Sequence, residues 1–205
     1  MSLFSQIFHK LNKYRLDVGL VYYLLTSLYL EKYTAFPEAA QHLLGIVLVC
    51  WIMSQYLFNR LTDQVEDRIS QPSEAVSAKE VRPLVTLLAL LLIIHVGILL
   101  YLDIFAWIYL VLIPLGVLYS YPFGKNKWRL KNLTLVKNIY AAFIGWILPI
   151  GLICYLYLVA PVSVGTLFTS LTIMGLVIFC FEVVWDIRDV KGDAVAGVKT
   201  LPVQF

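Results

Sequence analysis

The chain has 205 residues, of which 60% are hydrophobic and only 14% are charged, and its formal net charge is +3. Soluble domains carry about 25% charged residues, so this composition excludes a soluble globular protein and indicates an integral membrane protein. The small positive charge is confined to segments between apolar runs, which argues against nucleic acid as a partner.

Six apolar runs, each close to the roughly 20 residues needed to cross a bilayer, predict an all-α polytopic transmembrane helix bundle. We expect one domain over residues 1–205. In chain order the predicted spans are residues 17–34, 42–58, 84–102, 104–120, 138–158 and 163–185.

The basic residues lie almost entirely on one side of these spans. If the N-terminus is cytoplasmic, every Lys and Arg except Lys32 falls in a cytoplasmic segment. Since basic residues are enriched in cytoplasmic loops, this distribution predicts a cytoplasmic N-terminus in the cell (inner) membrane.

The segment FNRLTDQVEDRIS, residues 58–70, follows the second span and carries a first acidic cluster. In a continuous helix, successive residues are rotated by about 100°, so Asn59, Asp63, Glu66 and Asp67 point to one side. Carboxylates four residues apart repel each other by a few tenths of a kcal/mol per pair, so we expect an outside partner to compensate them.

The segment FEVVWDIRDVKGD, residues 181–193, ends the sixth span and carries a second acidic cluster. If its helix continues that far, Glu182, Asp186, Asp189 and Asp193 share one face. Oxygen ligands without His or Cys favour Mg²⁺, which binds through one or two carboxylates, waters and substrate phosphates. Two acidic faces on one membrane side therefore predict a divalent-metal site.

A basic loop, YPFGKNKWRLKN at residues 121–132, lies on the same side and carries Lys125, Lys127, Arg129 and Lys131. Basic side chains here can neutralise phosphate oxygens that the metal does not cover. Taken alone, the positive charge of this loop is explained by the enrichment of basic residues in cytoplasmic loops. Beside two acidic helix faces, the same charge favours a phosphate-binding site.

These patterns together resemble the signatures of the UbiA family of intramembrane aromatic prenyltransferases. The matching motifs are Asn59-xxx-Asp63-xxx-Asp67, Tyr121-xxx-Lys125, and Asp186-xx-Asp189-xxx-Asp193 followed by GVKTLPV. The resemblance implies a helical membrane bundle whose central cavity opens sideways to lipid. It also implies that the acidic motifs hold Mg²⁺ on the diphosphate of an isoprenyl donor.

The resemblance assigns roles by position. One metal ion would be bound by Asn59, Asp63 and Asp67, and the other by Asp186, Asp189 and Asp193. The residues that would contact the diphosphate are Asn59, Tyr121, Lys125, Lys127 and Arg129. The residues that would act in catalysis are Asp63, Asp67, Asp186, Asp189 and Lys125.

The implied activity is Mg²⁺-dependent transfer of an isoprenyl group from an allylic diphosphate to an aromatic or lipophilic acceptor in the membrane. Members of the family usually have nine spans, so we expect the six spans to form the N-terminal two-thirds of the fold. Two other classes are consistent with the sequence: an inactive or incomplete UbiA-like protein, and a cation-coupled transporter. The transporter is less favoured because the carboxylates gather at one end of the spans.

Overall fold

The computed structural model describes residues 16–72, 75–102, 106–125 and 128–205. The ordered elements in these ranges are helices, joined by turns and two isolated β-bridges, Thr34 to Leu158 and Phe123 to Trp128. The prediction of an all-α bundle is therefore confirmed.

Helical segments occupy all six predicted span positions. Five of them are α2 (Leu16–Tyr33), α3 (Glu38–Thr62), α5 (Ala78–Tyr101), α6 (Ala106–Ser120) and α9 (Val164–Ala196). The span predicted at 138–158 consists of α7 (Val136–Ile139), the π-helical η2 (Tyr140–Ile147) and α8 (Leu148–Leu156). Shorter elements are α4 (Gln64–Ser70), the 3-10 turn η1 (Leu130–Asn132) and α10 (Leu201–Gln204).

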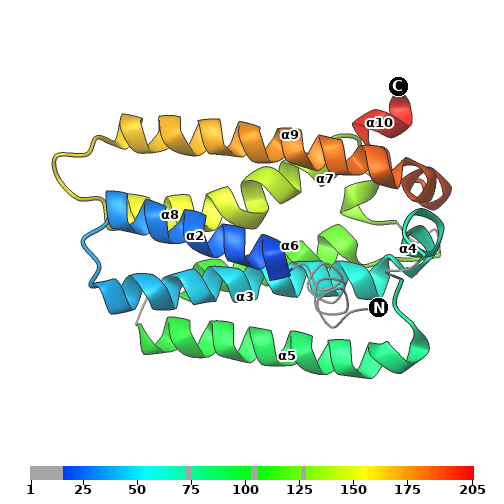
Figure 1. Cartoon of the computed structure of the whole chain (residues 1–205), viewed down its shortest axis with the longest axis horizontal. Coiled ribbons are helices and arrows are strands. Elements are labelled where there is room, and N and C mark those ends of the chain that lie inside the picture. The colour runs from blue at the N-terminus through cyan, green and yellow to red at the C-terminus, as the bar shows by residue number, and fades with distance from the viewer. Residues whose placement is uncertain (1–15, 73–74, 103–105, 126–127) are drawn as a thin grey trace, which may run out of the picture.

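Four of the described helices are long and apolar enough to cross a membrane: α3, α5, the continuous run Val136–Leu156, and α9. The helix α2 carries three charged residues in its 18 residues, and the described part of α6 has 15 residues. Figure 1 shows the long helices running side by side along the longest axis of the molecule, as expected for a membrane bundle.

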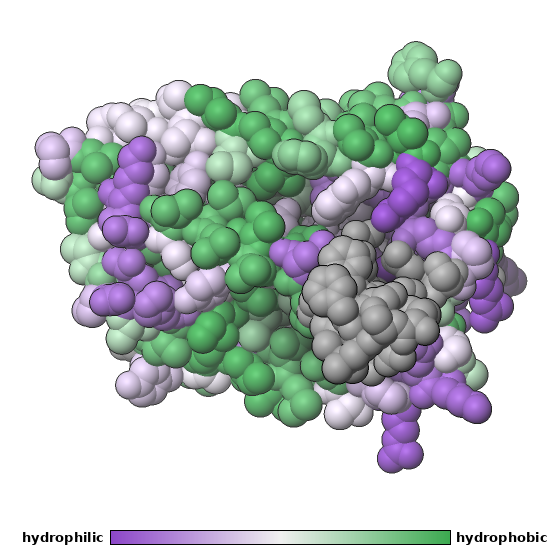
Figure 2. Space-filling view, viewed as in Figure 1, coloured by the Kyte–Doolittle hydropathy of each residue, from purple (hydrophilic) through white to green (hydrophobic). Residues whose placement is uncertain are grey.

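The outer surface of the bundle is strongly apolar. Leu28 on α2, Ile93 on α5 and Ile173 on α9 are about 60% exposed or more. Figure 2 shows hydrophobic residues over the middle of the visible face and hydrophilic residues gathered toward the two ends of the helices. An apolar surface of this extent between polar ends is typical of contact with lipid.

Two buried tryptophans bind helices of the bundle together. The indole of Trp51 on α3 donates to the carbonyl of Gly145 at 3.0 Å, and the indole of Trp146 donates to the hydroxyl of Thr26 on α2 at 3.0 Å. Each acceptor pairs an indole N–H group that burial would otherwise leave without a hydrogen bond. Because Gly145 and Trp146 both belong to η2, the two hydrogen bonds also hold η2 in place. The sequence pattern did not predict the π-helical turns of η2.

The first acidic cluster does not lie on one continuous helix, and that expectation was wrong. The helix α3 ends at Thr62, Asp63 adopts φ −98° and ψ 23°, and α4 begins at Gln64. The amide of Asp67 still donates to the carbonyl of Asp63 at 2.9 Å, so the chain bends without losing that hydrogen bond. In Figure 1, α4 turns away from the axis of α3 toward the end of α9.

The second acidic cluster does lie on one helix, as predicted. The helix α9 continues for 33 residues through Asp193 and ends before Gly197. Gly197 has φ 72°, the left-handed conformation that glycine adopts without steric cost after a helix. Asp186 and Asp193 therefore lie two turns apart on the same side of α9.

The helices α4 and α9 approach each other closely at Gly192. The hydroxyl of Ser70 donates to the carbonyl of Asp189 at 3.2 Å and accepts from the amide of Gly192 at 2.9 Å. A Cβ at position 192 would overlap the Ser70 hydroxyl and lie 2.6 Å from the carbonyl oxygen of Glu66. Only glycine permits this contact, which brings the two acidic segments together.

We expect Gly192→Ala to destabilise the protein by about 1–3 kcal/mol, because the methyl group pushes α4 away from α9. Thermal unfolding of the purified protein in detergent measures the effect as a lower Tm. The matched control is Gly97→Ala on α5, where an added Cβ meets no atom within 4 Å. Equal Tm values for the two variants would contradict this account of the helix contact.

Candidate functional site

A cavity of about 170 Å³ lies between the ends of α3, α4, η2 and α9. One buried water needs only roughly 10–15 Å³, so this cavity can hold a sizeable polar group together with solvent. The predicted site residues that line it are Asn59, Asp63, Asp67, Asp186 and Asp189. The structure thus brings residues of both acidic segments to one cavity.

The other predicted residues lie elsewhere. Asp193 does not line the cavity, although it is buried nearby. Tyr121 and Lys125 are exposed, and Lys127 lies outside the described residues. The Tyr121 ring packs against the ring of Phe123 at 5.2 Å, in a loop that bends back through the bridge between Phe123 and Trp128. The start of the loop is therefore on the surface.

The end of the same loop is buried in the first acidic segment. The guanidinium of Arg129 donates to Asp63 at 3.1 Å and to Glu66 at 2.5 Å, and the ammonium of Lys131 lies 2.5 Å from Asp63. Arg129 and Lys131 are only 5% and 2% exposed. In this structure Arg129, predicted as a diphosphate contact, instead pairs with carboxylates, because its burial requires an opposite charge.

Hydrogen bonds also position the remaining polar residues of the cavity. Arg60 pairs with Asp67 at 3.3 Å, and the amide of Gln71 donates to Asp189 at 2.8 Å. The hydroxyl of Ser120, at the end of α6, donates to the side-chain oxygen of Asn59. These contacts hold the oxygen-bearing side chains in fixed places around the cavity.

Two residues of α7, Lys137 and Asn138, join the second acidic segment, and sequence reasoning missed both. The ammonium of Lys137 lies 2.8 Å from Asp186 and 2.7 Å from Asp193. The amide of Asn138 donates to the second oxygen of Asp186 at 2.7 Å. A usable signal was present, since Lys137 opens an apolar span and an ionisable residue there is a functional candidate.

The mutual repulsion of the acidic residues is therefore compensated by cationic side chains. We expected a divalent cation in that role, but Arg60, Arg129, Lys131 and Lys137 already pair with the carboxylates. Repulsion between the carboxylates is therefore not by itself evidence for a metal ion. Whether the site can bind one depends on which carboxylate oxygen atoms remain outside these ion pairs.

The oxygen atoms of the first segment fit Mg²⁺ bound together with a substrate. Among the described residues, no three His, Cys, Asp or Glu side chains form a ready metal cage. Arg129 and Lys131 both pair with Oδ1 of Asp63, however, and Arg60 pairs with Oδ2 of Asp67. The other oxygen of each carboxylate has no ion pair within the described ranges. Mg²⁺ characteristically uses one or two carboxylates, waters and phosphate oxygens.

Aromatic side chains line the cavity deeper in the bundle. The rings of Tyr119 and Tyr140 are stacked with centroids 4.0 Å apart, and the hydroxyl of Tyr140 donates to Gln55 at 3.2 Å. Trp146 and Tyr22 continue this wall, with ring centroids 5.8 Å apart. The cavity therefore has a charged end, near Asp63 and Asp189, and an aromatic end, near Tyr22 and Trp146, where Glu182 also lines the wall.

A comparison of the sequence with protein families matches the UbiA prenyltransferase family over residues 20–205. The chain belongs to this family. Neither the curated proteins nor the solved structures give a significant match. Together with the four apolar helices, membership identifies an integral membrane protein of the UbiA fold. In general terms, the family implies prenyl transfer within the membrane from an isoprenyl diphosphate to a lipophilic acceptor.

In this UbiA protein one cavity carboxyl has a strongly shifted pKa. Burial raises the pKa of Asp67 from its ordinary value of 3.8 to about 6, with Asp63 and Asp189 adding to the rise. The Arg60 guanidinium acts in the opposite direction but does not cancel the effect of burial. Ionising Asp67 therefore costs the folded state free energy.

We expect this cost to appear as a pH dependence of stability. Below pH 4, Asp67 is protonated in both the folded and unfolded states, and its favourable contribution is lost as the pH rises through about 6. Asp67→Asn cannot ionise, so in EDTA its Tm should exceed that of the wild type at pH 7.5 and match it near pH 4. The gain corresponds to at most about 3 kcal/mol at 1.36 kcal/mol per pKa unit. A Tm difference that is the same at both pH values would contradict the raised pKa.

Proposed function

We propose that the chain transfers an isoprenyl group from an allylic diphosphate to an aromatic or lipophilic acceptor, with Mg²⁺ at the charged end of the cavity. One observation carries the proposal: both acidic segments line a single cavity whose deeper part is aromatic. The segments join through Gln71 and Asp189, which are 118 residues apart in sequence. This combination suits a ligand with a charged head and an apolar tail.

The metal ligands proposed here are the first of the two sets that the sequence predicted. Asn59, Asp63 and Asp67 would hold Mg²⁺ on one side of the cavity, with the second acidic segment opposite. When bound, Mg²⁺ supplies a positive charge that stabilises the departing pyrophosphate. Asp63 and Asp67 support this assignment because each has a carboxylate oxygen outside the ion pairs described above.

The protein's own cations would bind the diphosphate in addition. In the reaction, the bond between C1 and the diphosphate oxygen breaks, and the electron pair leaves with pyrophosphate. C1 then bonds to the acceptor, which releases a proton. Arg60, Lys137 and Arg188 line the cavity, so the negative charge that develops on the leaving group meets preorganised positive charge. Tyr121, Lys125, Lys127 and Arg129 stay predicted diphosphate contacts.

The aromatic end would protect the allyl cation. Tyr119, Tyr140 and Trp146 present apolar rings that exclude water, which would otherwise capture the cation. The faces of aromatic rings also attract positive charge. Both properties favour attack by a lipophilic acceptor that enters from the membrane.

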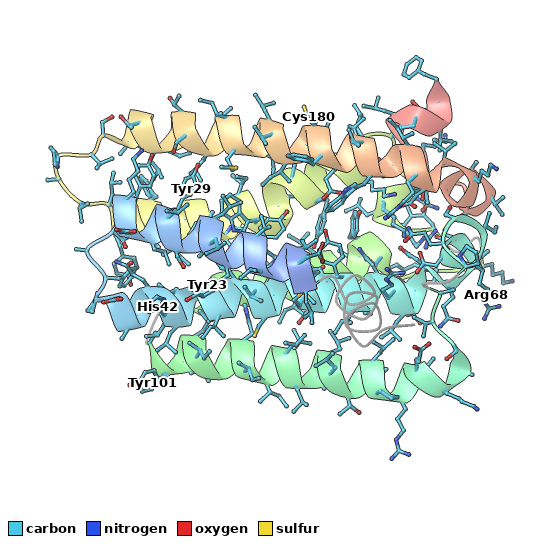
Figure 3. All side chains as sticks on the ribbon, viewed as in Figure 1. Tyr23, Tyr29, His42, Arg68, Tyr101 and Cys180 are labelled. Carbon is cyan, nitrogen blue, oxygen red and sulfur yellow. The ribbon has the colours of Figure 1, made fainter. Side chains whose placement is uncertain are left out.

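We place the charged end of the cavity on the cytoplasmic side. Figure 3 shows Arg68 near α4 at one end of the bundle, while His42 and Tyr101 lie at the opposite end. The basic residues Arg60, Arg129 and Lys131 belong to the Arg68 end, and cytoplasmic segments are enriched in such residues. A water-soluble pyrophosphate product would then leave into the cytoplasm.

Asp63→Asn and Asp189→Asn should each lower prenyl transfer by roughly 100-fold or more, because each removes charge that orients the metal and diphosphate. Transfer is measured with purified protein, Mg²⁺, radiolabelled geranyl diphosphate and a panel of aromatic and lipid acceptors. Circular dichroism checks that the variants remain folded.

The matched control is Glu38→Gln, which changes an exposed carboxylate at the opposite end of the bundle and should retain wild-type activity. Wild-type rates in both aspartate variants would contradict the proposed site. Absence of any product from the wild-type protein across the panel would contradict the proposed reaction.

A further inference from the structure

The second acidic segment differs from the first because a lysine bridges its two most buried carboxylates. The ammonium of Lys137 lies 2.8 Å from Oδ1 of Asp186 and 2.7 Å from Oδ2 of Asp193. The two aspartates are only 2% and 4% exposed. This is the position that a bridging cation would take between two carboxylates on one helix face.

Both oxygens of Asp186 already have a partner. Its Oδ1 pairs with Lys137, and its Oδ2 accepts from the amide of Asn138 at 2.7 Å. A metal ion bound between Asp186 and Asp193 would take the place of the ammonium, and one bound at Oδ2 of Asp186 would compete with the amide of Asn138, which is itself fully buried. Asp63 and Asp67, in the first segment, each keep one oxygen outside the ion pairs of the described residues.

Lys137 also reaches the cavity that the two acidic segments share. An ammonium group has three N–H donors, and the two aspartates accept two of them. The third is available to an oxygen atom of a ligand in the cavity. A lysine in this place supplies the positive charge that the second acidic segment would otherwise take from a metal ion.

We propose that the ammonium of Lys137 is a fixed cation that replaces the second metal ion, so that the site holds one divalent metal, beside Asn59, Asp63 and Asp67. The proposal rests on the proposed function, from which it takes the metal and the diphosphate. It departs from the two-metal prediction because Asp186 and Asp193 already share a cation. A divalent ion placed between them would also be repelled by the adjacent ammonium.

The test counts bound metal. The purified 205-residue chain in detergent is dialysed to equilibrium against Mn²⁺ and inorganic pyrophosphate, and protein-bound Mn²⁺ is measured against a protein-free chamber. We expect one Mn²⁺ per chain in the wild type and two in Lys137→Met, which removes the charge but keeps an unbranched side chain. Lys137→Arg retains the charge and should bind one.

A second control removes a lysine at the other end of the bundle. Lys32, whose ammonium lies 5.3 Å from the ring centre of Tyr33, is outside the site, and Lys32→Met should bind as many Mn²⁺ ions as the wild type. Circular dichroism establishes which variants are folded.

Two Mn²⁺ ions in the wild type would overturn the proposal, whether or not Lys137→Met folds. Equal counts in the wild type and in folded Lys137→Met would overturn it as well. A wild type without Mn²⁺ would instead contradict the metal requirement of the proposed function. In that case, a gain of one ion in Lys137→Met would still support the role of Lys137.

Discussion

The close approach of α4 to α9 at Gly192 is the contact on which the candidate site depends. The acidic segments end different membrane helices, and the Ser70 hydroxyl joins them by binding the backbone of α9 at two points. Because position 192 has no Cβ, the carboxylates of both segments can border one cavity. The charged end of the cavity is thus a consequence of helix packing at the membrane boundary.

Charge compensation is the second requirement of this arrangement. A buried carboxylate is costly unless it is paired, and each segment obtains at least one cationic partner from the chain between the two segments. Arg129 and Lys131 come from the loop after α6 and pair with Asp63, and Lys137 pairs with the second segment. The basic residues after α6 thus compensate the buried carboxylates of the site, in addition to the cytoplasmic position that the sequence predicts for them.

The sequence was sufficient to locate the helices and insufficient to describe their contacts. Apolar runs predict spans because a bilayer imposes a length, and the spacing of the aspartates correctly predicts a shared face on α9. The break at Asp63, the π-helical η2 and the pairing of Lys137 with Asp193 depend on segments distant in the chain. Local periodicity contains no information on such contacts. For the same reason the sequence predicted that Arg129 contacts the diphosphate, whereas in the structure its guanidinium donates to Asp63.

The central claim is that the cavity between the acidic segments binds the metal and diphosphate of a prenyl donor. An anomalous difference map, recorded at the manganese edge from crystals grown with Mn²⁺ and inorganic pyrophosphate, tests it most directly. The account predicts a manganese peak in coordination contact with Asp63 and Asp67, with pyrophosphate in the cavity between that ion and α9. A cavity without manganese, or pyrophosphate bound at another surface of the molecule, would contradict it.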